Sequence, residues 1–122
     1  MSRRILVVDD QEDNRRILRD LLTNSGFEVI QAETGEQAVA LAEAHVPDLI
    51  LMDIQLPDID GYEATRRIKA TPALRATPLI VVTSYALSGD EAKALAAGAE
   101  AYVSKPFSPR ALLAKVREFL PS

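Results

Sequence analysis

The 122-residue sequence predicts an α/β fold in which a doubly wound parallel sheet is covered by helices on both faces. Three observations lead to this prediction. Strand-like runs alternate five times with segments of helical periodicity, three of the runs are almost wholly apolar, and capping signals mark several helix starts. The strand-like runs are residues 4–9, 27–32, 48–53, 78–83 and 100–104. Since crossovers between parallel strands are right-handed, few topologies remain.

The polarity of the runs indicates where each strand lies in the sheet. Runs 4–9, 48–53 and 78–83 are nearly all apolar, which is typical of strands buried on both faces. Run 27–32 carries polar residues, so we expect it at one edge of the sheet. Run 100–104 is short and polar in part, so we expect it at the other edge.

The helices are predicted from their ends and their apolar spacing. Cap residues followed three positions later by Glu or Gln are Thr34 with Gln37, Asp60 with Glu63, and Ser88 with Glu91. Ser108 before Pro109 fits a cap and a first-turn proline. Apolar residues at helical spacing are Ile17, Leu18, Leu21 and Leu22 in a helix over 13–25, and Leu112, Leu113, Val116, Phe119 and Leu120 in the last helix. Gly26 and Gly98 are expected to end the first and fourth helices.

Composition excludes several classes of function. The net charge is −4 and no basic block exceeds a pair, so a nucleic-acid surface is not expected. The absence of cysteine excludes disulfides, thiolate metal ligands and a cysteine nucleophile. No apolar run approaches membrane-spanning length, and the first residues lack the features of a signal peptide. We therefore expect a cytoplasmic protein with one domain over residues 1–122 and no output domain.

Charged side chains follow three of the predicted strands. Asp9 and Asp10 follow the first apolar run, Asp53 ends the third, and Lys105 follows the fifth. Because the carboxyl ends of parallel strands line the ligand crevice, we expect three acids and a lysine in one pocket. Hard oxygen ligands of this kind suit Mg²⁺. Without a cation, carboxylates this close should raise at least one pKa among them.

Together these residues resemble the receiver domain of bacterial two-component response regulators, over essentially the whole chain. The matching motifs are VDD at 8–10, LMDIQLPDIDG at 51–61, VTSYA at 82–86, GA at 98–99 and SKPF at 104–107. The resemblance implies a (βα)5 flavodoxin-like fold with strand order 2-1-3-4-5. It also implies a signalling switch rather than an enzyme for external substrates, similar to stand-alone receivers.

The resemblance implies a role for each acid of the pocket. Asp53 matches the phospho-acceptor, because the chemistry needs a carboxylate nucleophile beside a metal. Asp10, Asp53, the backbone carbonyl of Gln55 and, partly through water, Asp9 match the Mg²⁺ ligands, with Mn²⁺ as an alternative metal. Adjacent residues of a strand point to opposite faces, so the strand must end before both Asp9 and Asp10 can face one cation.

The remaining site residues are also assigned by resemblance. Thr83 matches the switch hydroxyl, Lys105 the lysine that pairs with the acids and then the phosphoryl group, and Tyr102 the aromatic switch. Gln55 and Tyr85 match two positions that flank the attacking water and tune the lifetime of the acyl phosphate. The bond between Lys105 and Pro106 is expected to be cis. Gly61 is expected to supply a turn conformation that other residues disfavour, and His45 to be a solvent-facing helix end without a catalytic role.

The implied partners are a sensor histidine kinase or histidine phosphotransfer protein, and a downstream protein target. Phosphorylation would change the surface of the fourth helix, fifth strand and fifth helix, in a monomer or a phosphorylation-dependent dimer. Candidates for contact with the phosphodonor lie on the early turns of the first helix: Gln11, Asn14, Arg15 and Leu18.

Three other functions were weighed. A Mg²⁺-dependent phosphatase of the aspartyl-phosphate type would carry Asp-x-Asp after the first strand, whereas this chain has Asp9, Asp10 and Gln11. A phosphorylation-independent binding module would have lost an acid, the threonine or the lysine, whereas this chain keeps all five. A flavin or nucleotide carrier would need a glycine-rich phosphate loop after the first strand, which the sequence lacks.

Overall fold

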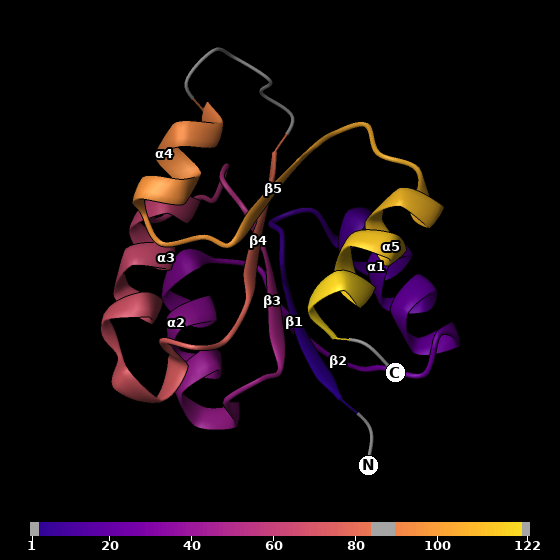
Figure 1. Ribbon diagram of the computed structural model, residues 1–122, viewed down its shortest axis with the longest axis horizontal. Helices are drawn as coiled ribbons and strands as arrows, with labels where there is room; N and C mark the ends of the chain where they lie inside the picture. The colour runs from indigo at the N-terminus through magenta and orange to yellow at the C-terminus, as the bar shows by residue number, and fades with distance from the viewer. Residues whose placement is uncertain (1–2, 84–89, 121–122) are drawn as a thin grey trace.

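A computed structural model describes residues 3–83 and 90–120 of the chain (Figure 1). Tyr85, Ser88 and the other residues of segment 84–89 lie outside this description. The strands are β1 (Arg4–Val8), β2 (Glu28–Ala32), β3 (Leu49–Asp53), β4 (Leu79–Thr83) and β5 (Ala101–Ser104). The helices are α1 (Glu12–Asn24), α2 (Gly35–His45), α3 (Gly61–Ala70), the short 3-10 helix η1 (Pro72–Leu74), α4 (Asp90–Ala96) and α5 (Pro109–Phe119). Each strand agrees with its predicted range to within one residue at either end.

The strands form one parallel sheet in the order β2-β1-β3-β4-β5, which confirms the predicted order and both predicted edges. Figure 1 shows α2, α3 and α4 on one face of the sheet and α1 and α5 on the other. All strands run in the same direction, so their carboxyl ends meet at a single edge. The doubly wound α/β prediction is therefore confirmed.

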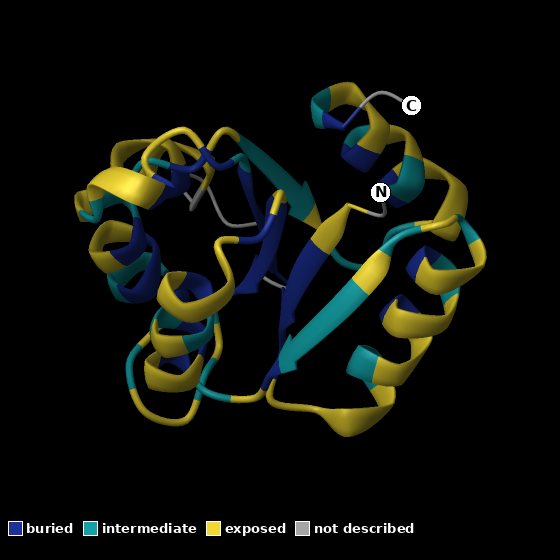
Figure 2. Cartoon of the chain, turned by 90° about the horizontal axis from the view of Figure 1, so that it is seen from below, coloured by how far each residue is buried: buried dark blue, intermediate teal, exposed yellow. Residues whose placement is uncertain are grey.

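Two hydrophobic cores lie on opposite faces of the sheet because successive strand side chains alternate. The core on the side of α2, α3 and α4 contains Leu6 and Val8 of β1, Ile50 and Met52 of β3, and Leu79 and Val81 of β4. The core on the side of α1 and α5 contains Ile5 and Val7 of β1, Leu49 and Leu51 of β3, and Ile80 and Val82 of β4. Figure 2 shows the buried central strands and the exposed outer faces of the helices. These cores hold the central strands, and hence the site at their ends, in fixed register.

The observed helix ends confirm most of the predicted signals. The side chains of Thr34, Asp60 and Ser108 each accept a hydrogen bond from the backbone N–H three residues later. Gly26 and Gly98 adopt positive φ angles of 95° and 109°, each two residues after the last residue of its helix, α1 or α4. In both places the N–H groups of the glycine and of the residue after it donate to carbonyls of the last helical turn, so glycine closes the helix.

Two sequence expectations are wrong. Gly61 does not adopt positive φ; it starts α3, and a Cβ there would collide with the backbone carbonyl of Asp53. Glycine is needed at that position for close approach of two backbones, not for a turn conformation. Ile17, although at core spacing in α1, has 60% of its surface exposed. The apolar stripe of α1 is narrower than its sequence suggested, and Leu18 and Leu22 fill it.

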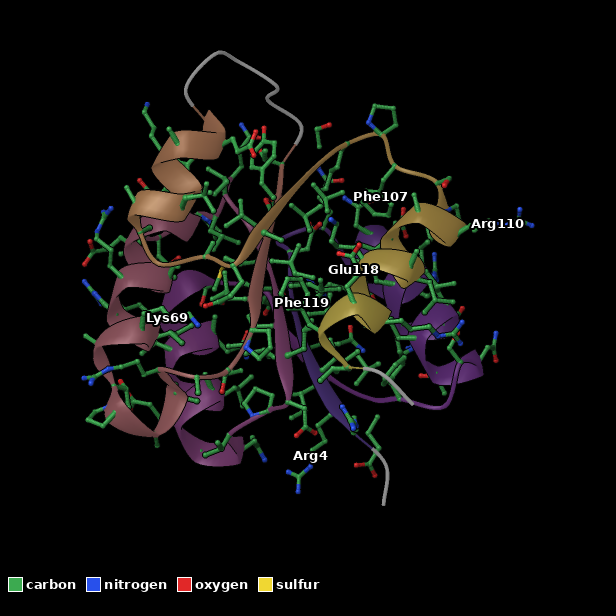
Figure 3. All side chains as sticks on the ribbon, in the orientation of Figure 1. Arg4, Lys69, Phe107, Arg110, Glu118 and Phe119 are labelled. Atoms are coloured by element: carbon green, nitrogen blue, oxygen red, sulfur yellow. The ribbon has the colours of Figure 1, made fainter. Side chains whose placement is uncertain are left out.

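A half-buried lysine, Lys69, joins the helical layer to the sheet on the α2–α4 side. The Lys69 ammonium group donates to the backbone carbonyls of Arg75 and Thr77 and contacts the carboxylate of Glu100. Glu100 also accepts from the backbone N–H of Leu79, 2.7 Å away, so α3 is tied to the beginnings of β4 and β5. Figure 3 shows Lys69 on this side of the sheet and Phe107 on the side of α5.

His45 is the last residue of α2 and is exposed, as expected. No helix in the described ranges is long and apolar enough to cross a membrane.

Candidate functional site

The carboxyl ends of four strands bring polar side chains to one place. Asp9 follows β1, Asp53 ends β3, Thr83 ends β4 and Lys105 follows β5. The first three are buried, with only 2%, 6% and 1% of their surfaces exposed. Charged and hydroxyl groups at this depth need partners, because burial without them is costly. The strand ends therefore define the candidate site.

The two adjacent aspartates face the same pocket because β1 ends before them. The last residue of β1 is Val8, so the alternation of side chains stops there. One carboxylate oxygen from each of Asp9, Asp10 and Asp53 lies within 4.8 Å of the other two. Asp10 is the exposed member of this trio. Three converging carboxylates form a donor set that suits a hard cation such as Mg²⁺.

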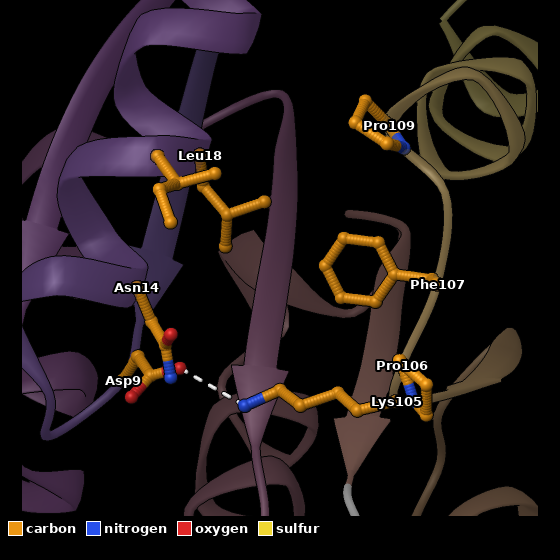
Figure 4. A pocket seen from close by; sticks show the side chains of 8 residues that line it. Asp9, Asn14, Leu18, Lys105, Pro106, Phe107 and Pro109 are labelled. Atoms are coloured by element: carbon orange, nitrogen blue, oxygen red, sulfur yellow. Dashed lines mark hydrogen bonds and ion pairs between the residues drawn. The ribbon is translucent and has the colours of Figure 1, made fainter.

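Lys105 reaches across the pocket to two of the acids, and Figure 4 shows its contact with Asp9. Its Nζ lies 3.1 Å from Oδ2 of Asp9 and 3.4 Å from Oδ2 of Asp53. Its backbone N–H donates to the carbonyl of Thr83 over 2.6 Å, which continues the β4–β5 pairing. The Lys105–Pro106 peptide bond is cis, the isomer expected from the sequence. The lysine is thus anchored by its backbone while its ammonium group bridges Asp9 and Asp53.

Backbone N–H groups hold the other oxygens of the buried acids. Oδ1 of Asp9 accepts from the N–H of Gln11 at 2.9 Å, and Oδ1 of Asp53 accepts from the N–H of Gln55 at 3.3 Å. Each carboxylate therefore has one oxygen toward Lys105 and one toward the loop that follows its strand. This arrangement fixes both carboxylates before any ligand arrives.

Burial raises the pKa of Asp53 above the usual value for an aspartate. The Lys105 ammonium opposes this rise, the Asp9 carboxylate adds to it, and the N–H groups of Gln55 and Ile54 oppose it. A raised pKa in the pocket is expected from the sequence, and the direction is confirmed at Asp53. Desolvation contributes more than the repulsion between acids on which that prediction rested.

The other predicted site residues lie around this centre. Thr83 is buried and pairs in register with Ser104, so it stands beside the strand that leads to Lys105. Tyr102 is half-buried and packs against the core under α2–α4. Gln55 has an exposed side chain, two residues after Asp53. Tyr85 lies outside the described residues.

A groove opens beside the acids, between α1 and the segment that joins β5 to α5. Its volume is about 310 Å³. The lining residues are Asp9, Asn14, Ile17, Leu18, Lys105, Pro106, Phe107 and Pro109. Figure 4 shows the ring of Phe107 turned toward Leu18 across this groove. An apolar groove therefore runs directly up to the Asp9–Lys105 ion pair.

Two residues near the site have roles that the sequence did not indicate. Arg15, a predicted contact for the phosphodonor, is folded inward with only 12% of its side chain exposed. Asp58, in the loop after β3, accepts from the backbone N–H groups of Gly35 and Glu36, each at 2.8 Å. These contacts link the loops around the site to one another. Neither could be read from sequence spacing, because the partners lie on other elements.

Comparison with known proteins agrees with this geometry. The sequence model of the response regulator receiver domain matches residues 5–117. The chain is similar to the polar-differentiation response regulator DivK of Brucella ovis, with 42% identity over 120 residues that cover 98% of both chains. The chain therefore belongs to the response regulator receiver domain family of two-component signalling. Receiver domains are signalling switches, so a phosphatase for external substrates is not favoured.

Solved structures show the same fold. The receiver domain of sensor histidine kinase PA1611 from Pseudomonas aeruginosa, determined with a magnesium ion in its active site cleft, has a TM-score of 0.92 and 38% identity, with all of both chains covered. Chemotaxis protein CheY4 of Vibrio cholerae has a TM-score of 0.93 and 27% identity, covering 98% of this chain and 99% of its own. Receiver domains bind Mg²⁺ at an acidic pocket, and the acids of this chain form such a pocket.

Proposed function

We propose that this receiver domain accepts a phosphoryl group on Asp53 from a phosphohistidine, in a Mg²⁺-dependent reaction that switches its surface. The observation that carries the proposal is the convergence of three carboxylates within 4.8 Å, two of them bridged by Lys105. Surface acids with a purely structural role have no reason to converge at the ends of two neighbouring strands. A trio of this kind, in which Asp9 and Asp53 are buried, instead lowers stability until a cation binds.

The chemistry follows from the position of Asp53. An oxygen of its carboxylate attacks phosphorus, the N–P bond of the phosphohistidine breaks, and the electron pair stays on the imidazole nitrogen, which then binds a proton. Asp10, Asp53, the Gln55 carbonyl and, partly through water, Asp9 would hold Mg²⁺, which supplies charge neutralisation for the transferring group. Lys105, already 3.4 Å from Asp53, would turn its ammonium toward the new phosphoryl oxygens.

The nucleophile has to be ionised, and the pocket contains groups that favour this form. Burial raises the pKa of Asp53, while Lys105 and the N–H groups of Gln55 and Ile54 act in the opposite direction. A bound cation would favour the carboxylate further. The same groups therefore prepare Asp53 for attack and for stabilising the charge of the product.

The switch would use Thr83 and Tyr102. The Thr83 hydroxyl, at the buried end of β4, would donate to a phosphoryl oxygen on Asp53, and Tyr102 on the neighbouring strand would move inward after it. This shifts a pre-existing equilibrium of the α4–β5–α5 surface, and with it the affinity for a downstream protein. Gln55 and Tyr85 would flank the attacking water and tune the lifetime of the acyl phosphate.

The phosphodonor would dock on α1 beside the groove. Ile17 is 60% exposed at the rim, and Asn14 and Gln11 lie about one and two turns nearer the acids. Leu18 lines the groove from a nearly buried position, with 5% exposed, and Arg15 is turned inward. A histidine kinase or phosphotransfer helix could place its phosphohistidine over Asp53 while it covers Ile17 and Phe107.

The test is direct phosphorylation by a small donor. The purified protein is incubated with acetyl phosphate or phosphoramidate, with and without Mg²⁺, and its intact mass is measured. We expect one added phosphoryl group that requires Mg²⁺ and is absent from the Asp53→Asn variant. The matched control is Asp20→Asn, which changes an exposed aspartate on α1 and should be labelled like the wild type.

An adduct of unchanged stoichiometry on Asp53→Asn would contradict the assignment. If no adduct forms on the wild type, rapid self-hydrolysis is checked with beryllofluoride, which mimics the phosphoryl group without hydrolysing. Failure of beryllofluoride to bind as well would favour the phosphorylation-independent binding module over a phospho-acceptor. Turnover of an external phosphoester would instead favour the phosphatase.

A further inference from the structure

Two adjacent arginines on α1 have opposite environments. Arg16 has 59% of its side chain exposed and pairs with Asp13 on the same helix. Arg15 has 12% exposed, and its guanidinium lies against the turn between β1 and α1. A mostly buried guanidinium must be held by several acceptors, since its charge is costly to desolvate. The contacts of Arg15 therefore indicate what it holds in place.

The guanidinium of Arg15 reaches three acceptors from separate segments. Its Nη1 donates to the backbone carbonyl of Asp9 over 2.7 Å. Its Nε donates to Oε1 of Gln31 over 3.3 Å, and its Nη2 lies 3.7 Å from Oε2 of Glu33. Gln31 and Glu33 belong to the end of β2 and the residue after it, which is a rigid support beside β1. The planar fork of arginine suits such simultaneous contacts.

The contact with Asp9 fixes the peptide unit that leads into Asp10. The N–H of Asp9 donates to the carbonyl of Ala32 over 3.1 Å, and its carbonyl accepts from Arg15. The orientation of this peptide decides the direction in which the next side chain, Asp10, leaves the backbone. Among the described residues, no side-chain hydrogen bond holds the Asp10 carboxylate itself. Its place in the acidic trio therefore depends on the backbone before it.

We propose that Arg15 is a positioning residue for the cation site: it holds the peptide between Asp9 and Asp10 so that both carboxylates face Asp53. The inference rests on the proposed function, because it assigns Arg15 to the Mg²⁺ site of that reaction. The inference goes beyond the proposed function because it assigns Arg15 to metal affinity and not to contact with a partner.

Because Arg15 is positively charged, the direction of the change in Mg²⁺ affinity on its replacement tests the proposal. A nearby positive charge repels a divalent cation, so removal of the charge alone would strengthen Mg²⁺ binding. Loss of the hydrogen bond to the Asp9 carbonyl acts in the opposite direction, because a less ordered Asp10 is a weaker ligand. Residues that orient ligands typically change metal affinity about 10–100-fold when they are replaced. The positioning role therefore predicts weaker binding on removal of a cation, which Coulomb repulsion cannot explain.

The experiment is calorimetric titration of MgCl₂ into four proteins: the wild type, Arg15→Met, Arg16→Met and Asp10→Ala. Arg16→Met is the matched control, because it removes an equal charge one residue away without touching the Asp9 carbonyl. We expect Arg15→Met to bind Mg²⁺ on the order of tenfold more weakly, and Arg16→Met to bind like the wild type or slightly more tightly. Thermal unfolding without Mg²⁺ checks that each variant is folded.

Unchanged or tighter Mg²⁺ binding by folded Arg15→Met would overturn the positioning role, even if its melting temperature falls. If Arg15→Met does not fold, the smaller polar change Arg15→Gln takes its place with the same two outcomes. Absence of Mg²⁺ binding by the wild type would overturn the proposed function and this inference together. Wild-type binding that Asp10→Ala removes, combined with unaltered binding by the Arg15 variant, would overturn this inference alone.

Discussion

Charges at the strand-end pocket and charges on the α2–α3 surface are arranged in opposite ways. On the surface, the guanidinium of Arg67 lies 2.8 Å from Glu36 and 3.0 Å from Glu63, and all three side chains are exposed. There, hydrogen bonds from Arg67 and Arg66 lower the pKa of Glu63. In the pocket, burial raises the pKa of Asp53. Pairing dominates on the surface, whereas desolvation dominates in the pocket.

The two regions differ in how their charges affect the stability of the fold. An exposed ion pair contributes little to the free energy of unfolding, typically about 0.2–1 kcal/mol. Asp9 and Asp53 are buried and lie close together, so the ionised form of Asp53 opposes folding. Such an arrangement persists where it is needed to bind a cation or a substrate. The pocket is therefore a site that the rest of the fold holds in place.

Removal of Lys105 should have the largest effect. Lys105→Met leaves Asp9 and Asp53 without their shared cation, so we expect a loss of about 2 kcal/mol, less than the roughly 3–5 kcal/mol for a fully buried pair. The ammonium lowers the pKa of Asp53, so its loss raises that pKa further and the deficit should shrink as the pH falls. Urea unfolding across pH measures both effects. The double variant with Asp53→Asn should recover part of the loss, and an additive double variant would contradict this coupling.

Gly61 and Gly26 separate two reasons for glycine. Gly61→Ala places a Cβ against the carbonyl of Asp53, so we expect a loss of about 1.5 kcal/mol from overpacking against backbone. Gly26→Ala meets no atom within 4 Å but has a φ of 95°, so the cost should be about 1 kcal/mol from backbone strain. Thermal or urea unfolding compares the two. Equal losses would show that the close approach at Asp53 is readily relieved.

Asp58 should make an intermediate contribution. Its carboxylate accepts from two N–H groups at the start of α2, a contact that ordinarily contributes about 1 kcal/mol. Although partial desolvation acts the other way, these hydrogen bonds lower the pKa of Asp58. Its stabilisation is therefore present above the usual aspartate pKa and is lost as the pH falls through the lowered value. Asp58→Ala should lose about 1 kcal/mol at neutral pH and nothing in strong acid; a loss independent of pH would contradict the capping role.

The surface network should matter least. Arg67→Met removes two exposed ion pairs, so we expect the smallest loss of stability of the set, and high salt should reduce it further. Unfolding in low and high salt provides the measurement. A loss as large as that of Lys105→Met would remove the contrast between the two regions.

Much of the fold could be predicted from local signals. Apolar runs located the strands, and Thr34, Asp60 and Ser108 marked helix starts, because capping depends on residues close in sequence. Ile17 could not be placed, since its spacing fits the apolar stripe while the neighbouring elements decide how wide that stripe is. Gly61 was misread because a close approach of α3 to β3 depends on tertiary packing.

The charged residues of the site could be predicted from the sequence, but the residue that supports them, Arg15, could not. Asp9, Asp10, Asp53 and Lys105 follow strands, and parallel topology brings strand ends together. Arg15 was not recognised, because nothing in an α1 sequence distinguishes an inward arginine from an exposed one such as Arg16. Its partners on β2 become visible only once the sheet order is known.

The most direct test of the contrast is the unfolding free energy of the wild type and Asp53→Asn, without Mg²⁺, across pH. Because the folded-state pKa of Asp53 is raised, the folded protein binds the proton more tightly than the unfolded chain, and wild-type stability falls as the pH rises from the ordinary value of 3.8 through the raised one. We predict that Asp53→Asn becomes the more stable protein above that window, by a margin that stays constant at higher pH and that Mg²⁺ reduces. A variant less stable than the wild type at neutral pH would show that the pocket acids stabilise the fold, and would contradict the contrast between the pocket and the surface.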